Sequence, residues 1–254
     1  MSFNLEHKVV LITGAASGIG KAASFAFAEN GAKVVAADVN EAEGLSVVKE
    51  ILSKGGEAIF VKCDVSNADD VKNMVETTML TYETLDVAIN NAGIGGVPGR
   101  TIDIDHKEFT RVMDINCTGV FYCMQEELKE MVKQKSGCII NTASIAGLRG
   151  LPNSLHYVAS KHAVVGMTKT AAMEYARLNI RVNALCPVFT VTPLFNPEAM
   201  DQFKAGLSDK LKSGIPMKRF STPQEMADAM LWLASDKASF VTGHALPVDG
   251  GLTA

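Results

Sequence analysis

Short apolar runs recur in the first part of the chain at intervals of about 25 residues, beginning near residues 9, 34 and 59. The first run, Val9–Ile12, has four apolar residues in a row. The segment that follows, 20–30, is rich in apolar residues and closes at Gly31, a residue typical of helix ends. A short run without apolar–polar alternation is typical of a strand buried on both faces. Strands alternating with helices at this spacing predict a parallel sheet covered by helices on both faces.

The alternation continues to the end of the chain. Further helices are expected over about 41–53, 67–82, 107–135, 157–179 and 223–235, and further strands over 85–89, 138–142, 180–184 and 245–248. No shift in composition and no linker marks a second domain, so residues 1–254 are expected to form a single domain. We predict a doubly wound α/β fold in which a parallel sheet of about seven strands lies between two layers of helices.

Composition excludes several classes of protein. Apolar residues make up 47% of the chain and charged residues 20%, which excludes disorder and coiled coil. The net charge is −4 and no run is rich in Lys and Arg, so we expect no nucleic-acid binding. No apolar run reaches the ~20 residues of a membrane span, and no secretion signal is recognisable. The five cysteines are scattered and the five histidines lack metal-ligand spacing, so we expect a cytoplasmic protein without a disulfide or a metal site.

A glycine-rich loop, Thr13–Gly20, separates the first expected strand from the first expected helix. Its glycines are Gly14, Gly18 and Gly20. Glycines at such a turn let the backbone approach a pyrophosphate, and the helix start offers free N–H groups and the positive end of the helix dipole. A loop of this kind can also be a tight turn without a ligand, but its place between strand and helix favours dinucleotide binding.

Asp38 ends the second expected strand, 18 residues after Gly20. A carboxylate here can accept hydrogen bonds from both ribose hydroxyls of NAD, and it would repel the additional phosphate of NADP. Neither Ser17 nor Val39 supplies a compensating cation. The sequence therefore predicts NAD rather than NADP as the cofactor.

The next two expected strands also end in residues that can meet a ligand. The carboxyl ends of strands form the edge at which open α/β sheets bind their ligands. Asp64 could meet the adenine amino group, or it could cap the helix that follows. Asn91 could brace neighbouring strand ends, and Gly93 could let the chain pass close to a ribose. Each of these residues, taken alone, has an equally good structural interpretation.

Tyr157 and Lys161 lie four residues apart at the start of a long expected helix, so their side chains point to the same face. A phenol with a pKa near 10 is a poor base at neutral pH, but a nearby cation stabilises the phenolate and lowers that pKa. The pair alone would be typical of a surface helix. Ser144, just beyond the strand 138–142, could bind a substrate oxygen and makes an acid–base site the better interpretation.

Together these motifs resemble those of the short-chain dehydrogenase/reductase family over nearly the whole chain. The matching motifs are Thr13-Gly-x-x-x-Gly-x-Gly20, Asn90-Asn-Ala-Gly93, Ser144, Tyr157-x-x-x-Lys161, Thr242-Gly243 and Val248-Asp-Gly-Gly251. The resemblance implies a Rossmann-type fold with Tyr157 as catalytic acid/base and Ser144 orienting the substrate oxygen. Lys161 would bind the nicotinamide ribose and lower the tyrosine pKa. The resemblance also implies that Asn116 helps to hold a proton-relay water near the lysine.

The motifs and the resemblance assign a larger set of residues to ligands. The expected cofactor-binding residues are Gly14, Ser17, Gly18, Ile19, Gly20, Asp38, Asp64, Val65, Asn91, Ala92, Gly93, Tyr157, Lys161, Pro187, Thr190 and Thr192. The expected substrate-binding residues are Ser144, Leu151 and Tyr157. One position departs from the family pattern: Val188 stands where the family usually has glycine, so the loop beside the nicotinamide is expected to differ in geometry. The long mixed stretch 192–217 is expected to be a substrate lid.

Candidate pocket residues are mostly apolar: Ile94, Ile145, Leu148, Leu151, Leu155, Leu194, Phe195 and Met200. They predict a neutral secondary alcohol or ketone of modest size, such as a diol, a cyclic alcohol or a sugar, that exchanges a hydride with the nicotinamide. Arg149 could bind an anionic substrate, although a solvated arginine is the more common case. His156 and His162 flank the catalytic pair, but neighbouring helix positions point elsewhere and neither receives a role.

Three other functions are considered. The glycine spacing disfavours a sugar epimerase or dehydratase of related fold. A 3-oxoacyl reductase acting on acyl carriers is usually NADP-linked, which Asp38 disfavours. A non-catalytic NAD-binding sensor would have little use for Ser144, Tyr157 and Lys161 together. Because the family usually forms tetramers through the helices around 107–135 and 157–179, we expect a homotetramer.

Overall fold

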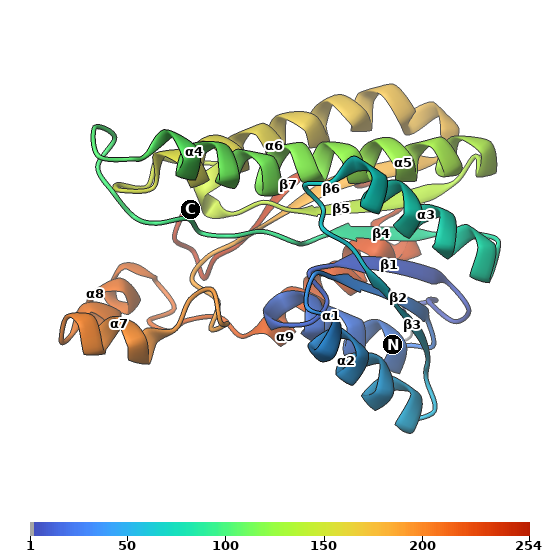
Figure 1. The fold of residues 1–254 in the computed structure, drawn as a ribbon, viewed down its shortest axis with the longest axis horizontal. Coiled ribbons are helices and arrows are strands. Elements are labelled where there is room, and N and C mark those ends of the chain that lie inside the picture. The colour runs from blue at the N-terminus through green and yellow to red at the C-terminus, as the bar shows by residue number, and fades with distance from the viewer. Residues whose placement is uncertain (1–2) are drawn as a thin grey trace.

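The computed structural model describes residues 3–254 and contains a parallel sheet of seven strands (Figure 1). The strands are β1 (Val9–Thr13), β2 (Lys33–Asp38), β3 (Glu57–Lys62), β4 (Val87–Asn90), β5 (Gly137–Thr142), β6 (Ile180–Pro187) and β7 (Ala245–Val248). Their order is β3-β2-β1-β4-β5-β6-β7, and every neighbouring pair is parallel. The predicted doubly wound sheet is confirmed. The strand order reverses between β1 and β4, which is where such sheets open a crevice for a ligand.

Helices cover both faces of this sheet (Figure 1). One layer consists of α3 (Ala68–Tyr82), α4 (His106–Met113), α5 (Gly119–Gln134) and α6 (Leu155–Tyr175). The other layer consists of α1 (Gly18–Glu29), α2 (Glu41–Ser53) and α9 (Pro223–Ala234). Two short helices, α7 (Pro197–Phe203) and α8 (Leu207–Gly214), stand away from the sheet beyond the carboxyl ends of the strands.

The central strand β1 shows why its sequence is apolar throughout. All five of its side chains are buried. Val9 and Leu11 pack into the core beneath α3, α5 and α6, whereas Val10 and Ile12 pack into the core beneath α1, α2 and α9. Successive strand residues point to opposite faces of a sheet, so a strand covered on both sides needs apolar residues at every position.

The helix expected over 107–135 is interrupted by a π-helical turn, Asp114–Thr118, between α4 and α5. The α-helix resumes at Gly119, where a Cβ atom would lie only 2.9 Å from Val65 Cγ2 and 3.0 Å from the Val65 carbonyl oxygen. The turn carries Asn116, which is completely buried. Single π-helical turns inside α-helices occur frequently at functional sites.

The helix expected over 157–179 begins two residues earlier, at Leu155, and its α-helical part ends at Tyr175, followed by a 3₁₀ turn over Ala176–Leu178. Tyr157 and Lys161 therefore occupy its first two turns. No helix within residues 3–254 combines the length and the apolar character that a membrane span requires.

Candidate active site

A cavity of about 900 Å³ runs along the carboxyl edge of the sheet and is lined by residues at the strand ends and by residues of the segment that carries α7 and α8. Most predicted ligand-binding residues line it: Gly14, Ser17, Gly18, Ile19, Asp38, Asp64, Val65, Asn91, Ala92, Gly93, Ser144, Leu151, Tyr157, Lys161, Pro187, Thr190 and Thr192. The two exceptions are Gly20 and Asn116, which are buried behind the wall. The fold thus brings residues from many parts of the chain around one space.

The loop after β1 leaves the first turn of α1 open toward this cavity. Its N-cap residue, Ser17, makes no side-chain capping bond, and no acidic residue stands in the first turn. Gly14 has a φ of 66°, in the left-handed region, and a Cβ atom at Gly20 would lie 2.1 Å from the Gly14 carbonyl oxygen. The turn therefore needs glycine at both positions. Free N–H groups at a helix start form a binding site for an anion such as a pyrophosphate.

Asp38 lies at the carboxyl end of β2 and lines the cavity. Its carboxylate oxygens accept hydrogen bonds from the backbone N–H groups of Ala16 and Asn40, both at 2.9 Å. These bonds tie the carboxylate to the glycine-rich loop. Among the described residues that line the cavity, Lys161 is the only lysine or arginine.

Asn91 braces neighbouring strand ends, as one interpretation of the sequence held. Its Nδ2 donates to the Thr13 carbonyl oxygen at 3.1 Å, and its backbone N–H donates to Thr13 Oγ1 at 3.0 Å.

Asp64 does not cap the following helix, because Asn67 occupies the N-cap of α3. The Asp64 carboxylate instead accepts bonds from the N–H and the hydroxyl group of Ser66.

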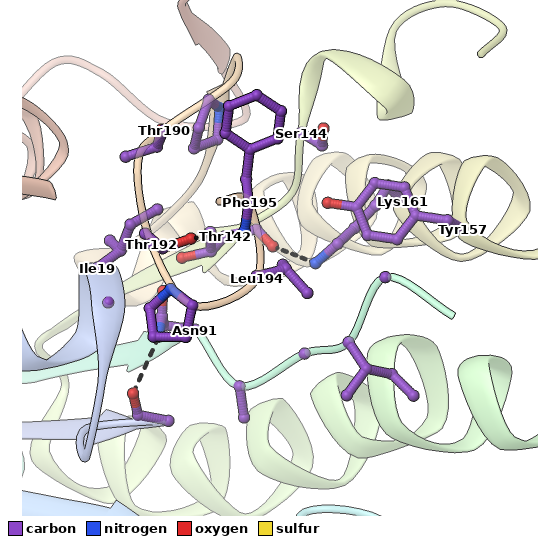
Figure 2. A pocket seen from close by; sticks show the side chains of 18 of the residues that line it. Ile19, Asn91, Thr142, Ser144, Tyr157, Lys161, Thr190, Thr192, Leu194 and Phe195 are labelled. Atoms are coloured by element: carbon purple, nitrogen blue, oxygen red, sulfur yellow. Dashed lines mark hydrogen bonds between the residues drawn. The ribbon is translucent and has the colours of Figure 1, made fainter. Parts of the chain in front are cut away.

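Ser144, Tyr157 and Lys161 gather in one part of the cavity, beyond the end of β5 (Figure 2). Asp38 ends β2, which is separated from β5 by β1 and β4 in the sheet. The Lys161 side chain is 3% exposed, and its Nζ donates to the Thr142 carbonyl oxygen at 2.8 Å. The same Nζ lies 5.7 Å from the centroid of the Tyr157 ring. Ser144 is buried at the end of the loop after β5, and its Oγ accepts a hydrogen bond from the Ala146 N–H.

The expected lowering of the tyrosine pKa is wrong for the protein chain by itself. Burial raises the pKa of Tyr157, and a hydrogen bond with Ser144 offsets only part of that rise. Burial also lowers the pKa of Lys161 to about 8, so its ammonium group remains mostly protonated at neutral pH but loses its proton far more easily than an exposed lysine does. The side-chain spacing was predicted correctly, but desolvation is the largest cause of the pKa shift of both groups.

Asn116 holds a segment of the cavity wall in place. Its Oδ1 accepts from the Ile94 N–H and its Nδ2 donates to the Ile94 carbonyl oxygen, both at 2.8 Å. Nδ2 also approaches Ser160 Oγ at 3.3 Å. The side-chain amide is thus committed to the loop after β4, a contact for which the sequence held no signal apart from the family pattern.

Val188 is accommodated by an apolar cluster. It has no left-handed backbone conformation, and its side chain is buried against Ile145 and Ile215. The expected difference in loop geometry from the family stays a prediction. Val188 also lines the cavity next to Ser144.

The catalytic end of the cavity has an aromatic and aliphatic wall. Phe189 and Phe195 stack at a centroid distance of 5.1 Å, and Phe220 packs edge-on to Phe195 at 5.0 Å. Six of the eight predicted pocket residues line the cavity: Ile94, Ile145, Leu151, Leu194, Phe195 and Met200. Leu148 and Leu155 do not line it and are exposed, and Arg149 is also absent from the wall. Phe189 also lines the cavity but was not among the predicted pocket residues, because it precedes the predicted lid, residues 192–217.

No group of three or more His, Cys, Asp or Glu side chains in the described part of the chain is placed to hold a metal ion.

Comparisons with known proteins give the family. A sequence-family profile described as enoyl-(acyl carrier protein) reductase matches residues 14–253. The chain is 44% identical over 254 residues to 2,5-dichloro-2,5-cyclohexadiene-1,4-diol dehydrogenase of Sphingobium indicum, with 99% of both chains covered. It is 42% identical over 253 residues to cyclohexanol dehydrogenase of Acinetobacter sp., with 100% of this chain and 98% of the relative covered.

A solved structure of NAD⁺-bound xylitol dehydrogenase superposes with a TM-score of 0.93 at 32% identity, covering 98% of this chain and all of that chain. These similarities extend over nearly the full length of the chain. The chain belongs to the short-chain dehydrogenase/reductase family, and it is an oxidoreductase that acts on CH–OH groups with a nicotinamide cofactor.

Proposed function

We propose that this protein is an NAD-dependent dehydrogenase of neutral cyclic secondary alcohols, in which Tyr157 is the catalytic acid/base. One observation carries the proposal: a single cavity has Asp38 and the open start of α1 at one end and Ser144, Tyr157 and Lys161 within an apolar wall at the other. Relatives named for the oxidation of a cyclohexadiene diol and of cyclohexanol support the substrate class.

The residues present fit NAD. Ala92 and the Gly14 carbonyl oxygen occupy the Cβ positions at Gly14 and Gly20, so glycine at both positions keeps the turn tight. The helix start beyond this turn has no side-chain cap and can receive a pyrophosphate. The Asp38 carboxylate, held by two backbone N–H groups, can accept hydrogen bonds from both hydroxyls of the adenosine ribose. A phosphate on that ribose would meet the negative charge of Asp38. This preference for NAD over NADP is part of the proposal.

NAD supplies the acceptor for the hydride that leaves the carbinol carbon. Ser144 binds and orients the substrate oxygen, and Tyr157 in its phenolate form accepts the hydroxyl proton at Oη as the alcohol is oxidised. Lys161 stabilises the negative charge that develops on the phenol, and its pKa of about 8 lets it pass a proton onward near neutral pH. The Thr142 carbonyl oxygen keeps the Lys161 ammonium beside the tyrosine ring. In reduction the same residues work in the opposite direction.

The wall at the catalytic end favours a neutral ring over a charged chain. Ile94, Leu151 and Met200 line this end together with the Phe189–Phe195 stack, and Lys161 is its only charged side chain among the lining residues. A carboxylate substrate would have no arginine to pair with. An alicyclic alcohol fills such an apolar space while presenting one hydroxyl to Ser144 and Tyr157.

The test is NAD reduction with a panel of cyclohexanol, cyclic diols, linear secondary alcohols and a pentitol, at saturating NAD and in parallel with NADP. We expect turnover with the cyclic alcohols and NAD. Tyr157→Phe should lose nearly all turnover while NAD binding, followed by calorimetry, stays unchanged. Equal turnover in that variant would refute the assignment of Tyr157.

The competing function is reduction of acyl-carrier thioesters, which the description of the matching family profile favours. A 3-oxoacyl thioester with NADPH in the same assay decides between the two. Binding of NAD with no turnover of any alcohol or thioester would instead support an NAD-binding sensor.

Two further parts of the proposal concern motion and assembly. Residues 192–217, which carry α7 and α8, act as a lid over the apolar end of the cavity. Leu194 and Phe195 already contribute to the cavity wall.

The chain forms a homotetramer through α4, α5 and α6, which expose Phe121 and Met173. Sedimentation velocity tests the tetramer, and a monomer at micromolar concentration would overturn it.

A further inference from the structure

The segment 91–98, between β4 and α4, forms the cavity wall that faces the lid. Ile94, Gly95, Gly96 and Pro98 line the cavity, and a Cβ atom at Gly95 would touch Leu194 Cδ1 at 3.4 Å. The segment belongs to no helix or strand. Its position must therefore be set by contacts other than sheet hydrogen bonds, since buried or partly buried peptide groups need partners.

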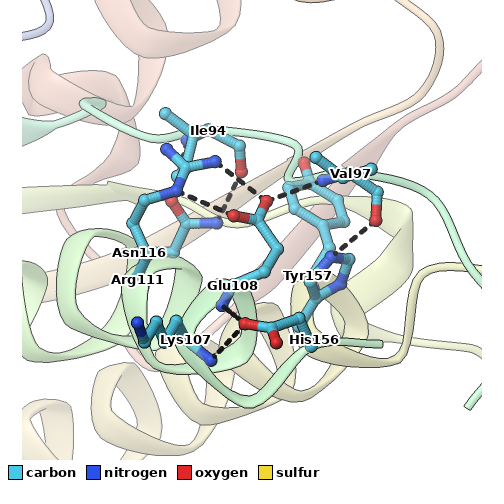
Figure 3. A network of polar contacts seen from close by, with 9 residues as sticks. Ile94, Val97, Lys107, Glu108, Arg111, Asn116, His156 and Tyr157 are labelled. Carbon is cyan, nitrogen blue, oxygen red and sulfur yellow. Dashed lines mark hydrogen bonds and ion pairs between the residues drawn. The ribbon is translucent and has the colours of Figure 1, made fainter. Parts of the chain in front are cut away.

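Side chains supply these contacts at two peptides. Asn116 binds both the N–H and the carbonyl oxygen of Ile94, as described above. Val97 is bound in the same way by two residues: its N–H donates to Glu108 Oε1 at 2.7 Å, and its carbonyl oxygen lies 3.2 Å from His156 Nε2 (Figure 3). We call Glu108, His156 and the Val97 peptide the Val97 clamp.

Glu108 is itself fixed in this arrangement. Arg111 Nε donates to Glu108 Oε2 at 2.9 Å and Arg111 Nη2 donates to Oε1 at 2.8 Å. Hydrogen bonding to Arg111, with a further contribution from the Val97 N–H, lowers the pKa of Glu108 to about 2. The carboxylate is therefore charged at neutral pH, which is the form that accepts the Val97 N–H.

His156 connects the clamp to the catalytic residue. The ring is completely buried, and its Nδ1 accepts the backbone N–H of Tyr157 at 2.9 Å. Since Nδ1 is an acceptor and the Val97 carbonyl can only accept, Nε2 must carry the proton and donate to Val97. Gly96 leaves the space for this ring, because a Cβ atom there would lie 2.5 Å from Nε2.

We propose that His156, supported by Glu108, is a positioning residue for the reaction: it sets the separation between the 91–98 wall and Tyr157, and so fixes a compact alcohol against the acid/base. The inference rests on the proposed function. It assigns a role to a residue that helix geometry alone placed away from the site. The clamp holds this segment at Val97, whereas its cofactor-facing start, Asn91 and Ala92, is held separately by hydrogen bonds to Thr13, so NAD affinity should not depend on the clamp.

Three variants test the clamp. His156→Gln keeps an N–H donor near the place of Nε2, whereas His156→Asn is too short to reach Val97. Glu126→Gln is the matched control, because Glu126 pairs with Lys129 three residues on, as Glu108 does with Arg111, and binds no loop. The readouts are kcat and KM for cyclohexanol, NAD affinity by calorimetry, and amide hydrogen exchange in the peptide 91–99.

In His156→Asn we expect kcat/KM to fall between about tenfold and a hundredfold, mainly through KM, as for a substrate displaced by up to about 1 Å. NAD affinity should be unchanged, and exchange in 91–99 should become faster. His156→Gln should recover much of the loss in both readouts, and Glu126→Gln should behave as wild type.

Equal defects in the Gln and Asn variants, or a parallel loss of NAD affinity, would overturn the positioning role in favour of a general packing role. The hydrogen-exchange measurement distinguishes a failure of the proposed function from a failure of the positioning role of His156. A wild-type protein that oxidises no alcohol refutes the proposed function, while unchanged exchange in His156→Asn refutes the clamp whether or not the enzyme turns over.

Discussion

Glu127 is a carboxyl group without solvent contact in the middle of the helix α5. Its Oε2 accepts a hydrogen bond from Asn90 Nδ2 at 3.0 Å, and the same Nδ2 donates to Asn141 Oδ1. Its Oε1 has no partner within residues 3–254. Burial raises the pKa of Glu127 from 4.5 to about 8, so the group is mostly protonated at neutral pH. This makes it a measurable source of pH-dependent stability.

Whether the stability rises or falls with pH follows from the direction of the Glu127 pKa shift. A carboxyl whose folded pKa lies above its unfolded value contributes its full stability below the unfolded pKa and loses it as the pH rises through the folded pKa. With values of 4.5 and about 8, the loss amounts to about 5 kcal/mol in all, at about 1.4 kcal/mol per pKa unit. About 4 kcal/mol of that loss falls between pH 5 and pH 9.

Glu127→Gln removes the titration and keeps a neutral side chain of the same shape. We therefore expect the unfolding free energy of the wild type, minus that of Glu127→Gln, to fall by about 4 kcal/mol from pH 5 to pH 9. Urea unfolding of both proteins across this range measures the difference, and other titrating groups cancel in it. Glu126→Gln, a substitution on the neighbouring partly exposed residue, is the control and should show no such trend. A constant difference for Glu127→Gln would refute the assignment of a buried neutral acid.

Three further changes test the cavity. Asp38→Ala should lower the preference for NAD over NADP by about tenfold to a hundredfold, because hydrogen bonds to a charged group are lost. The ratio of kcat/KM with NAD to kcat/KM with NADP measures this preference. An unchanged ratio would contradict our interpretation of Asp38. Gly20→Ala places a Cβ atom 2.1 Å from the Gly14 carbonyl oxygen, so it should destabilise the fold by about 1–3 kcal/mol and weaken NAD binding, as thermal unfolding and calorimetry would report. Phe195→Ala removes the ring stacked on Phe189 and should lower kcat/KM for cyclohexanol by about tenfold with NAD affinity intact; a loss confined to NAD affinity would place Phe195 at the cofactor instead.

Local sequence patterns predicted the features that depend on neighbouring residues. The unbroken apolar run at β1 indicated a strand covered on both faces, and both faces are buried. The spacing of Tyr157 and Lys161 placed both on one face of a helix, which the structure confirms. Leu148 and Leu155 were misplaced because apolar character alone does not tell a cavity wall from an exposed surface.

The order of strands and helices, the glycine-rich turn and the one-turn spacing of the catalytic pair were determined by sequence alone, because each follows from the conformations of a few consecutive residues. Tertiary structure decided the rest. The direction of the Tyr157 pKa shift depends on how completely the surrounding segments exclude water, and no local pattern contains that quantity. The bond from His156 to the Val97 carbonyl joins residues 59 positions apart, and the stack of Phe189 on Phe195 forms only when the segment after β6 folds back over the cavity. Contacts between distant segments, and the desolvation they cause, arise only when the chain is packed.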